Sequence, residues 1–279
     1  MTPDPAPQTP STTTLFQEVD IQRAPRFAIL GTAIAQDLHY KLLSELTIGA
    51  ADEAGSFAVD QVVRQTQLLK ADELSRSMFE QSLAELKGWQ FHYKLNARRE
   101  IALWKSSPPT GKRAAPVKPL GAEGFLVTSV MDEDGWKELA QLSFIVPDLQ
   151  SRNASWSRSL SHDFEPLGSW YGETRFTPQG VEHGVLRIDF VHEMVYTPPA
   201  KGKDKGALPF TIKEAKFRPE AAGGTIDYDT RAKRVQRAQE HFHVKGVLTA
   251  EVLGQEAGIE VEELQTIGVR LTEQNPWKR

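Results

Sequence analysis

The sequence contains no cysteine. Disulfides, thiolate metal ligands and cysteine nucleophiles are therefore excluded. Long hydrophobic runs are also missing, because no stretch reaches the roughly 18 apolar residues that a membrane-spanning helix requires. Basic residues are not in excess either: 33 Lys and Arg stand against 37 Asp and Glu, and the formal charge is −4. This balance predicts no general attraction to nucleic acid or to anionic membranes.

Familiar catalytic motifs are absent as well. No serine lies in a Gly-x-Ser-x-Gly segment, and no glycine-rich phosphate-binding loop occurs. The acidic run Asp132-Glu-Asp-Gly135 resembles part of a calcium loop, but Val130 and Gln141 would occupy two essential ligand positions. A capped helix start explains these acids better, and we expect no cofactor.

Alternation of apolar and polar residues with period two is the main pattern that the sequence does contain, and it is typical of sheets with one buried face. Several runs share it, with apolar residues at Leu38, Tyr40, Leu42, Leu46 and Ile48, at Trp89, Phe91, Tyr93 and Leu95, and at Leu186, Ile188, Phe190, Met194 and Tyr196. The longest run extends from Ala238 to Val252 and returns over residues 259–271. Strands of this length predict a strongly curved antiparallel sheet or a barrel.

Helical signals are scarce. Residues 72–87 form the clearest helix, because Met78, Phe79, Leu83 and Leu86 make an apolar stripe and Gly88 follows its end. A second, short helix is predicted to start near Asp134. The predicted class is mainly β (α+β), with long curved antiparallel sheets or barrel-like halves and one main helix packed on a sheet.

The chain divides into three predicted segments. Residues 1–25 are interpreted as a disordered Pro/Thr-rich tether, because Met1–Thr14 holds four Pro and five Thr. Residues 26–150 form an N-terminal β-rich half that includes the helix, and residues 151–279 form a C-terminal antiparallel β half.

Two histidines are the metal candidates. His241 and His243 lie two residues apart, so both side chains project from one face of a strand, about 7 Å apart. This spacing suits two ligands of one metal ion, but closed sites need three or four. A polar sheet face is the favoured interpretation, and a metal site is the alternative.

Ligand-binding candidates are His192, Trp156 and Trp170. His192 falls on the apolar face of its strand, where a buried histidine usually bonds a carbonyl or a carboxylate. Trp156 and Trp170 either anchor a core or line a cavity. The neighbouring Ser155–Asp163 run places Ser, His and Asp close in sequence, but residues so near each other do not form a catalytic triad without special geometry.

A family resemblance covers about residues 38–273. Phe144-Ile-Val-Pro-Asp-Leu149, the later Trp156, and hairpins at Gly224-Thr-Ile-Asp-Tyr228 and Gly254 resemble an uncharacterised class of bacterial exported β-rich proteins. That class usually has a glycine three residues before the tryptophan, where this chain has Asn153. The resemblance implies a two-half β protein of the cell envelope, often tethered as a lipoprotein, and it implies no catalytic residues.

These observations favour a non-enzymatic function. We expect a binding or scaffolding protein of the bacterial cell envelope that holds an apolar small molecule or an envelope protein against a curved sheet. The expected location is periplasmic or at the extracellular face, with a cytoplasmic location as the alternative. The competing function is a metal-dependent or hydrolytic enzyme centred on His241 and His243.

Overall fold

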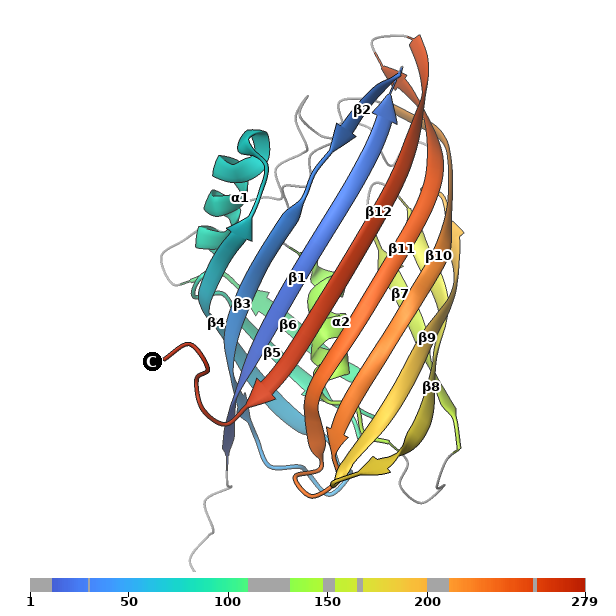
Figure 1. Ribbon diagram of the computed structural model, residues 1–279. Helices are drawn as coiled ribbons and strands as arrows, with labels where there is room; N and C mark the ends of the chain where they lie inside the picture. The colour runs from blue at the N-terminus through green and yellow to red at the C-terminus, as the bar shows by residue number, and fades with distance from the viewer. Residues whose placement is uncertain are drawn as a thin grey trace, which may run out of the picture.

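The computed structural model describes residues 12–29, 31–109, 131–147, 154–164, 168–199, 211–252 and 255–278. In this part of the chain, antiparallel strands form one sheet of twelve strands (Figure 1). The strands are β1 (Thr13–Ile29), β2 (Thr32–Ala35), β3 (Leu38–Ile48), β4 (Phe57–Lys70), β5 (Gln90–Leu95), β6 (Ile101–Ser107), β7 (Trp156–Asp163), β8 (Ser169–Glu182), β9 (Val185–Thr197), β10 (Thr211–Asp229), β11 (Arg234–Val252) and β12 (Gln255–Thr272). The described helices are α1 (Glu73–Leu86) and α2 (Glu133–Ser143), and neither is long and apolar enough to cross a membrane.

The first and last strands of the described chain pair in the middle of the sheet. The strand order is β6-β5-β4-β3-β1-β12-β11-β10-β9-β8-β7, with β2 paired to β1. Thus β1 lies between β3 and β12, and its ladder with β12 runs from Phe16 opposite Thr272 to Ile29 opposite Ile259. The strands of the two predicted halves, residues 26–150 and 151–279, therefore belong to one sheet, and they are joined through β1 and β12.

The predicted tether over residues 1–25 is wrong from Thr13 onward, because these residues form most of β1. Leu15, Gln17, Val19 and Ile21 are all buried, so this strand follows the same period-two pattern as the others. The Pro/Thr-rich segment Met1–Thr14 overlaps the start of β1, so composition alone does not indicate where the alternation of apolar and polar residues begins. Residues 1–11 lie outside the described part of the chain.

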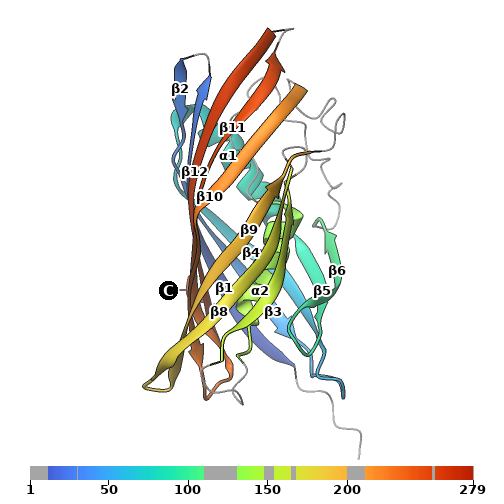
Figure 2. The same cartoon turned by 90° about the vertical axis from the view of Figure 1, so that its right-hand side faces the viewer.

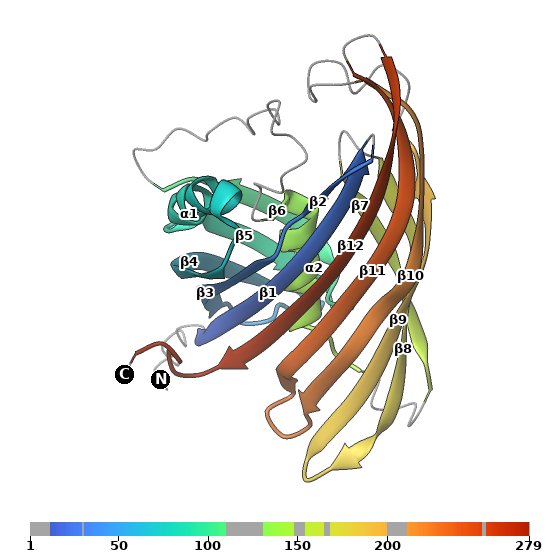
Figure 3. The same ribbon diagram turned by 45° about the horizontal axis from the view of Figure 1, so that its top comes forward.

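The sheet is long, antiparallel and strongly curved, as the strand lengths predicted, but it is not a closed barrel (Figures 2 and 3). Its edge strands β6 and β7 do not pair with each other in the described residues. Helix α2 lies between them, on the side toward which the sheet curves (Figure 3). We call this side the concave face, and its upper end is the end where β1 finishes and β12 begins (top of Figure 1).

Both helices contribute to one large core. In α1, Phe79 and Leu83 are buried, and the Phe79 ring centroid lies 5.0 Å from that of Tyr40 on β3. In α2, the Trp136 ring lies 4.6 Å from Phe91 of β5. The observed bounds of α1 agree with the predicted helix over 72–87 to within one residue at each end, and the predicted second helix is also confirmed.

A second, smaller core cluster lies on β10, β11 and β12. Its buried members are Ala215, Leu248, Ala250 and Ile259, with Tyr196, Ile212, Phe217 and Val261 packed against them and only partly buried. This cluster contains no helix residue. On β11, Phe242 and Val244 lie on the concave face between Ala238 of the large core and Leu248 of the second cluster, and they are also only partly buried. The upper concave face is therefore apolar and incompletely covered by the described residues.

Candidate functional site

A set of polar side chains crosses the concave face between the two core clusters. We call it the polar belt, and its members are Arg23 of β1, Asp132 and Glu138 at α2, His162 of β7, Thr174 of β8, His192 of β9, Glu240 of β11 and Glu263 of β12. Buried charges are normally paired, because removing an isolated charge from water is costly. Each ionisable member of the belt does have a partner.

Arg23 and Glu263 form the first pair. The Arg23 Nε and Nη2 atoms lie 2.7 and 2.6 Å from Glu263 Oε1. The Arg23 side chain is 18% exposed and that of Glu263 is 27% exposed, so the pair is largely shielded but open to the concave side. Burial opposes the charge on Arg23, but the charge and hydrogen bonding of Glu263, together with Tyr40 and Asp132, outweigh it and raise the pKa of the guanidinium.

His162 forms the second group with the two acids of α2. Its Nδ1 lies 2.9 Å from Glu138 Oε1 and its Nε2 lies 3.0 Å from Asp132 Oδ2. Burial opposes the charged imidazole, but hydrogen bonds to Asp132 and Glu138 outweigh this effect and raise the pKa of His162 to about 10. His162 is therefore an imidazolium at neutral pH and donates from both ring nitrogens.

The pKa values of the two acids in this group shift in opposite directions. Burial acts to raise the pKa of Asp132, but the hydrogen bond and charge of His162, together with the Gly135 N–H and Arg23, overcome it and lower that pKa. Burial raises the pKa of Glu138; His162 acts against this rise, and the neighbouring carboxylate Glu240 adds to it. The influence of Glu240 on Glu138 links this group to the next one along the belt.

His192 forms the third group. Its Nε2 lies 2.6 Å from Glu240 Oε1 and its Nδ1 lies 2.8 Å from Thr174 Oγ1. The imidazole also stacks on Phe242, with 5.1 Å between centroids and 5° between planes. His192, Thr174 and Glu240 are all buried. These contacts lock the ring between three strands.

The contact between His192 and Glu240 spans an intervening strand, because β10 separates β9 from β11. On β10, Gly224 faces Phe190 on one side and Glu240 on the other. A Cβ at Gly224 would lie 2.8 Å from Phe190 Cζ and 1.9 Å from the Gln239 carbonyl oxygen. The missing side chain thus leaves the space through which β9 side chains reach toward β11.

The Thr174–His192–Glu240 order resembles a nucleophile, base and acid in sequence. However, Thr174 is only 6% exposed and lies inside β8, paired on both sides by β7 and β9. A substrate carbonyl would have to reach this hydroxyl through packed side chains. The arrangement therefore fits a structural polar bridge better than nucleophilic catalysis.

Truncating Glu240 tests the strength of this bridge. We expect Glu240→Ala to lower the free energy of unfolding by about 2 kcal/mol, because it leaves the buried His192 without its acceptor. The matched control is Glu262→Ala on the opposite face, where Glu262 bonds His243 at 2.7 Å in a more exposed pair. The control should cost less than about 1 kcal/mol. Urea unfolding measures both variants, and an equal loss of unfolding free energy would contradict the role of Glu240 as a buried structural bridge.

The predicted ligand candidates occupy different places. His192 belongs to the polar belt. Trp170 is buried near it, with its ring 5.4 Å from Tyr196. Trp156 lies at the other end of the β7–β8 ladder, stacked on Phe176 at 5.1 Å as part of the large core. The structure thus brings His192 and Trp170 into one region and leaves Trp156 outside it.

His241 and His243 project from the convex face of β11. His241 is exposed, and His243 is partly exposed and bonds Glu262. No group of three His, Asp or Glu residues suited to a metal ion occurs in the described residues. Glu240 cannot join these histidines because its side chain points to the concave face.

The sequence signals missed the other members of the belt. Glu240 interrupts the apolar face of β11 between Ala238 and Phe242, and Arg23 follows Ile21 on the concave face of β1. A charged residue at an apolar position is the signal that could have identified both. The local Ser/His/Asp run around His162 does not indicate its partners, which are Asp132 and Glu138 at α2.

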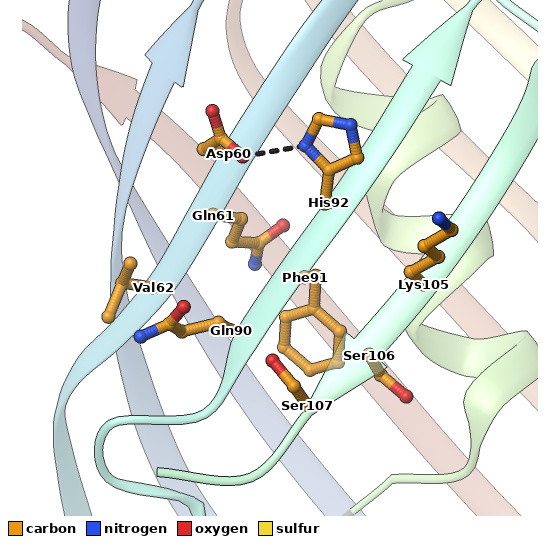
Figure 4. A pocket seen from close by; sticks show the side chains of 9 residues that line it. All are labelled: Asp60, Gln61, Val62, Gln90, Phe91, His92, Lys105, Ser106 and Ser107. Carbon is orange, nitrogen blue, oxygen red and sulfur yellow. Dashed lines mark hydrogen bonds and ion pairs between the residues drawn. The ribbon is translucent and has the colours of Figure 1, made fainter. Parts of the chain in front are cut away.

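A shallow hollow of about 320 Å³ lies at β4, β5 and β6 (Figure 4). In it Asp60 and His92 point toward each other, with 2.7 Å between Oδ1 and Nδ1, and Lys105 is opposite His92 in the β5–β6 ladder. The Asp60 side chain is 64% exposed and that of His92 is 47% exposed. These solvated side chains make a weaker candidate than the polar belt.

Comparisons with known proteins add little to this geometry. No protein-family model matches the chain, and no curated protein matches it. Among solved structures, a DUF1329 family protein from Desulfovibrio piger is similar at 9% sequence identity and a TM-score of 0.16, over 88% of this chain and 83% of that one. This is a loose likeness to a member of an uncharacterised family, and it is too distant to carry a functional argument.

Proposed function

We propose that this chain is a non-enzymatic binding protein of the bacterial cell envelope, and that it holds an apolar ligand with a polar end on the upper concave face. One observation carries the proposal: the partly exposed apolar side chains of the second core cluster lie next to the polar belt. Small-molecule sites commonly combine an apolar lining with a few placed polar groups.

The apolar part of the ligand would contact β10, β11 and β12. Phe217, Val244 and Val261 lie on the concave face there and retain exposed surface. Covering such surface contributes about 25 cal/mol for each Å² removed from water. This is the driving force that we assign to binding.

The polar end would meet the belt at Arg23 and Glu263. This pair lies beside Val244, because Glu263 is opposite Val244 in the β11–β12 ladder. Its guanidinium donors and carboxylate oxygens can orient either an acceptor or a donor on the ligand. The belt would thus set the direction in which the ligand lies.

A binding assay with opposite-face variants of β11 tests this site. We expect Val244→Asp to weaken the binding of a fluorescent long-chain acyl probe about tenfold or more, because the carboxylate is introduced into the apolar contact surface. Val247→Asp on the convex face is the control, since Val247 is already 51% exposed. It should bind the probe like the wild-type chain.

Two results would contradict the proposed function. The first is no measurable binding of the probe by the wild-type chain, by fluorescence titration and by native mass spectrometry of the lipid-extracted protein. The second is an equal loss of affinity for Val244→Asp and Val247→Asp, which would indicate a nonspecific effect. The envelope location is tested separately, by fractionating cells that express the natural gene and probing each fraction with an antibody.

A further inference from the structure

The sheet is forked between β9 and β10. These strands pair only from Val185 opposite Asp229 to Val191 opposite Gly223. Beyond that point, His192–Thr197 pairs with β8 alone and Thr211–Ala222 pairs with β11 alone, within the described residues. The two strands therefore diverge toward the upper end of the sheet, on the side that faces the viewer in Figure 2, and residues 200–210, which join them, lie outside the described part of the chain.

In the fork, β9 and β10 contact each other through side chains and not through backbone hydrogen bonds. The rings of Tyr196 on β9 and Phe217 on β10 meet edge to face, with 4.9 Å between their centroids. The Trp170 ring of β8 packs against Tyr196, with 5.4 Å between the ring centroids. Phe217 itself fits over Gly246, where a Cβ would lie 2.2 Å from its Cδ1 atom. Separating these rings breaks no β-ladder, whereas parting two paired strands breaks a row of hydrogen bonds.

The base of the fork is held firmly. Gly223 has φ +154°, and a Cβ there would lie 2.3 Å from the Phe190 carbonyl oxygen, so the strands approach closely at this point. Immediately beyond it, His192 bonds both Thr174 of β8 and Glu240 of β11. Movement of β9 away from β10 would thus be confined to the segment above His192.

The fork lies next to both surfaces that the proposed ligand would contact, the second core cluster and the polar belt. Phe217 and Tyr196 belong to the second core cluster, which lines the upper concave face. His192 and Glu240 at the base belong to the polar belt. The apolar rings beside the gap and the polar groups at its base together suit a ligand that has a long apolar chain and a polar end.

We propose that the β9–β10 fork is a lateral entry through which a long-chain amphiphile reaches the concave face, and that Tyr196 and Phe217 are its gate. The chain of the ligand passes between the two rings, and its polar end comes to lie near the belt. This proposal rests on the proposed function and adds to it the ligand class and the route of entry.

Cross-linking across the gate tests the route, since the chain has no native cysteine. The Tyr196→Cys, Phe217→Cys variant is joined by a short bifunctional methanethiosulfonate, which forms a disulfide with each cysteine, and it is compared with the same variant after reduction. The control is Asp189→Cys with Thr225→Cys, which are opposite each other where the strands are already paired. The measurement is the rate at which a fluorescent long-chain acyl probe leaves phosphatidylcholine vesicles for the protein.

We expect the cross-link at the gate to slow uptake about tenfold, with no change for the cross-linked control pair. Tyr196→Ala, which removes one ring without a cross-link, should speed both uptake and release. Unchanged rates for the cross-linked gate and for Tyr196→Ala would overturn the entry route while leaving the binding function intact. Absence of uptake by the wild-type chain and by every variant would overturn both proposals together.

Discussion

Replacing Gly224 by alanine is expected to lower the free energy of unfolding by about 3 kcal/mol, although the change adds a single methyl group. The added Cβ would lie 1.9 Å from the backbone oxygen of Gln239 on β11 and 2.8 Å from the Phe190 ring on β9. A flexible side chain could move aside, but a backbone carbonyl in a ladder cannot move without shifting β11 relative to β10. The strain therefore falls on the strands that carry Glu240 and His192.

The matched control for this substitution is Gly258→Ala on β12, where a Cβ would meet no atom within 4 Å. Alanine restricts the unfolded chain more than glycine does, so the control should be neutral or stabilising by up to about 1 kcal/mol. Urea unfolding of both variants gives the comparison. A loss of similar size at both positions would mean that strand glycines matter here for a reason other than close approach.

The second large effect is expected at His162. His162→Leu should lower the free energy of unfolding by about 3 kcal/mol at neutral pH, because it leaves Asp132 and Glu138 facing each other without the intervening cation. The matched control is His92→Leu, which breaks the more exposed contact with Asp60 and should cost at most about 1 kcal/mol.

The pH dependence of stability separates this electrostatic effect from lost packing. The pKa of His162 is raised from 6.5 to about 10, so the folded state holds its proton more tightly than the unfolded state does. The resulting stabilisation is complete below pH 6.5 and is lost as the pH rises through about 10. The wild-type chain should therefore lose more stability over this range than His162→Leu does. Parallel pH profiles would show that the imidazolium contributes nothing.

Local patterns predicted much of the secondary structure. The Ala238–Val252 run and its return correspond to the β11–β12 ladder, and the apolar runs at residues 38–48 and 186–196 correspond to β3 and β9. Both helices were also predicted. These features depend on residues near one another in sequence, for which periodicity and end signals are sufficient.

The candidate site was predicted only in part. His192 was identified as a buried histidine, but Glu240 and Thr174 could not be named as its partners, because they lie 48 and 18 residues away. The connection to Glu240 also depends on the side-chain-free Gly224, a feature of three adjacent strands rather than of any one of them. His162 likewise acquires its cationic character from an α2 helix that the sequence alone does not place beside β7.

The sequence by itself determined that this protein is built from long one-sided strands, because the side-chain period of a strand is a local property. It also excluded cysteine chemistry and predicted both helices. Only the tertiary structure decided that β1 pairs with β12, although almost the whole chain separates them, and that the curved sheet stays open. It also decided that polar side chains from seven elements meet in one belt. Pairing between distant strands is chosen by the packing of whole faces and by the pairing of buried charges, and no local pattern specifies either.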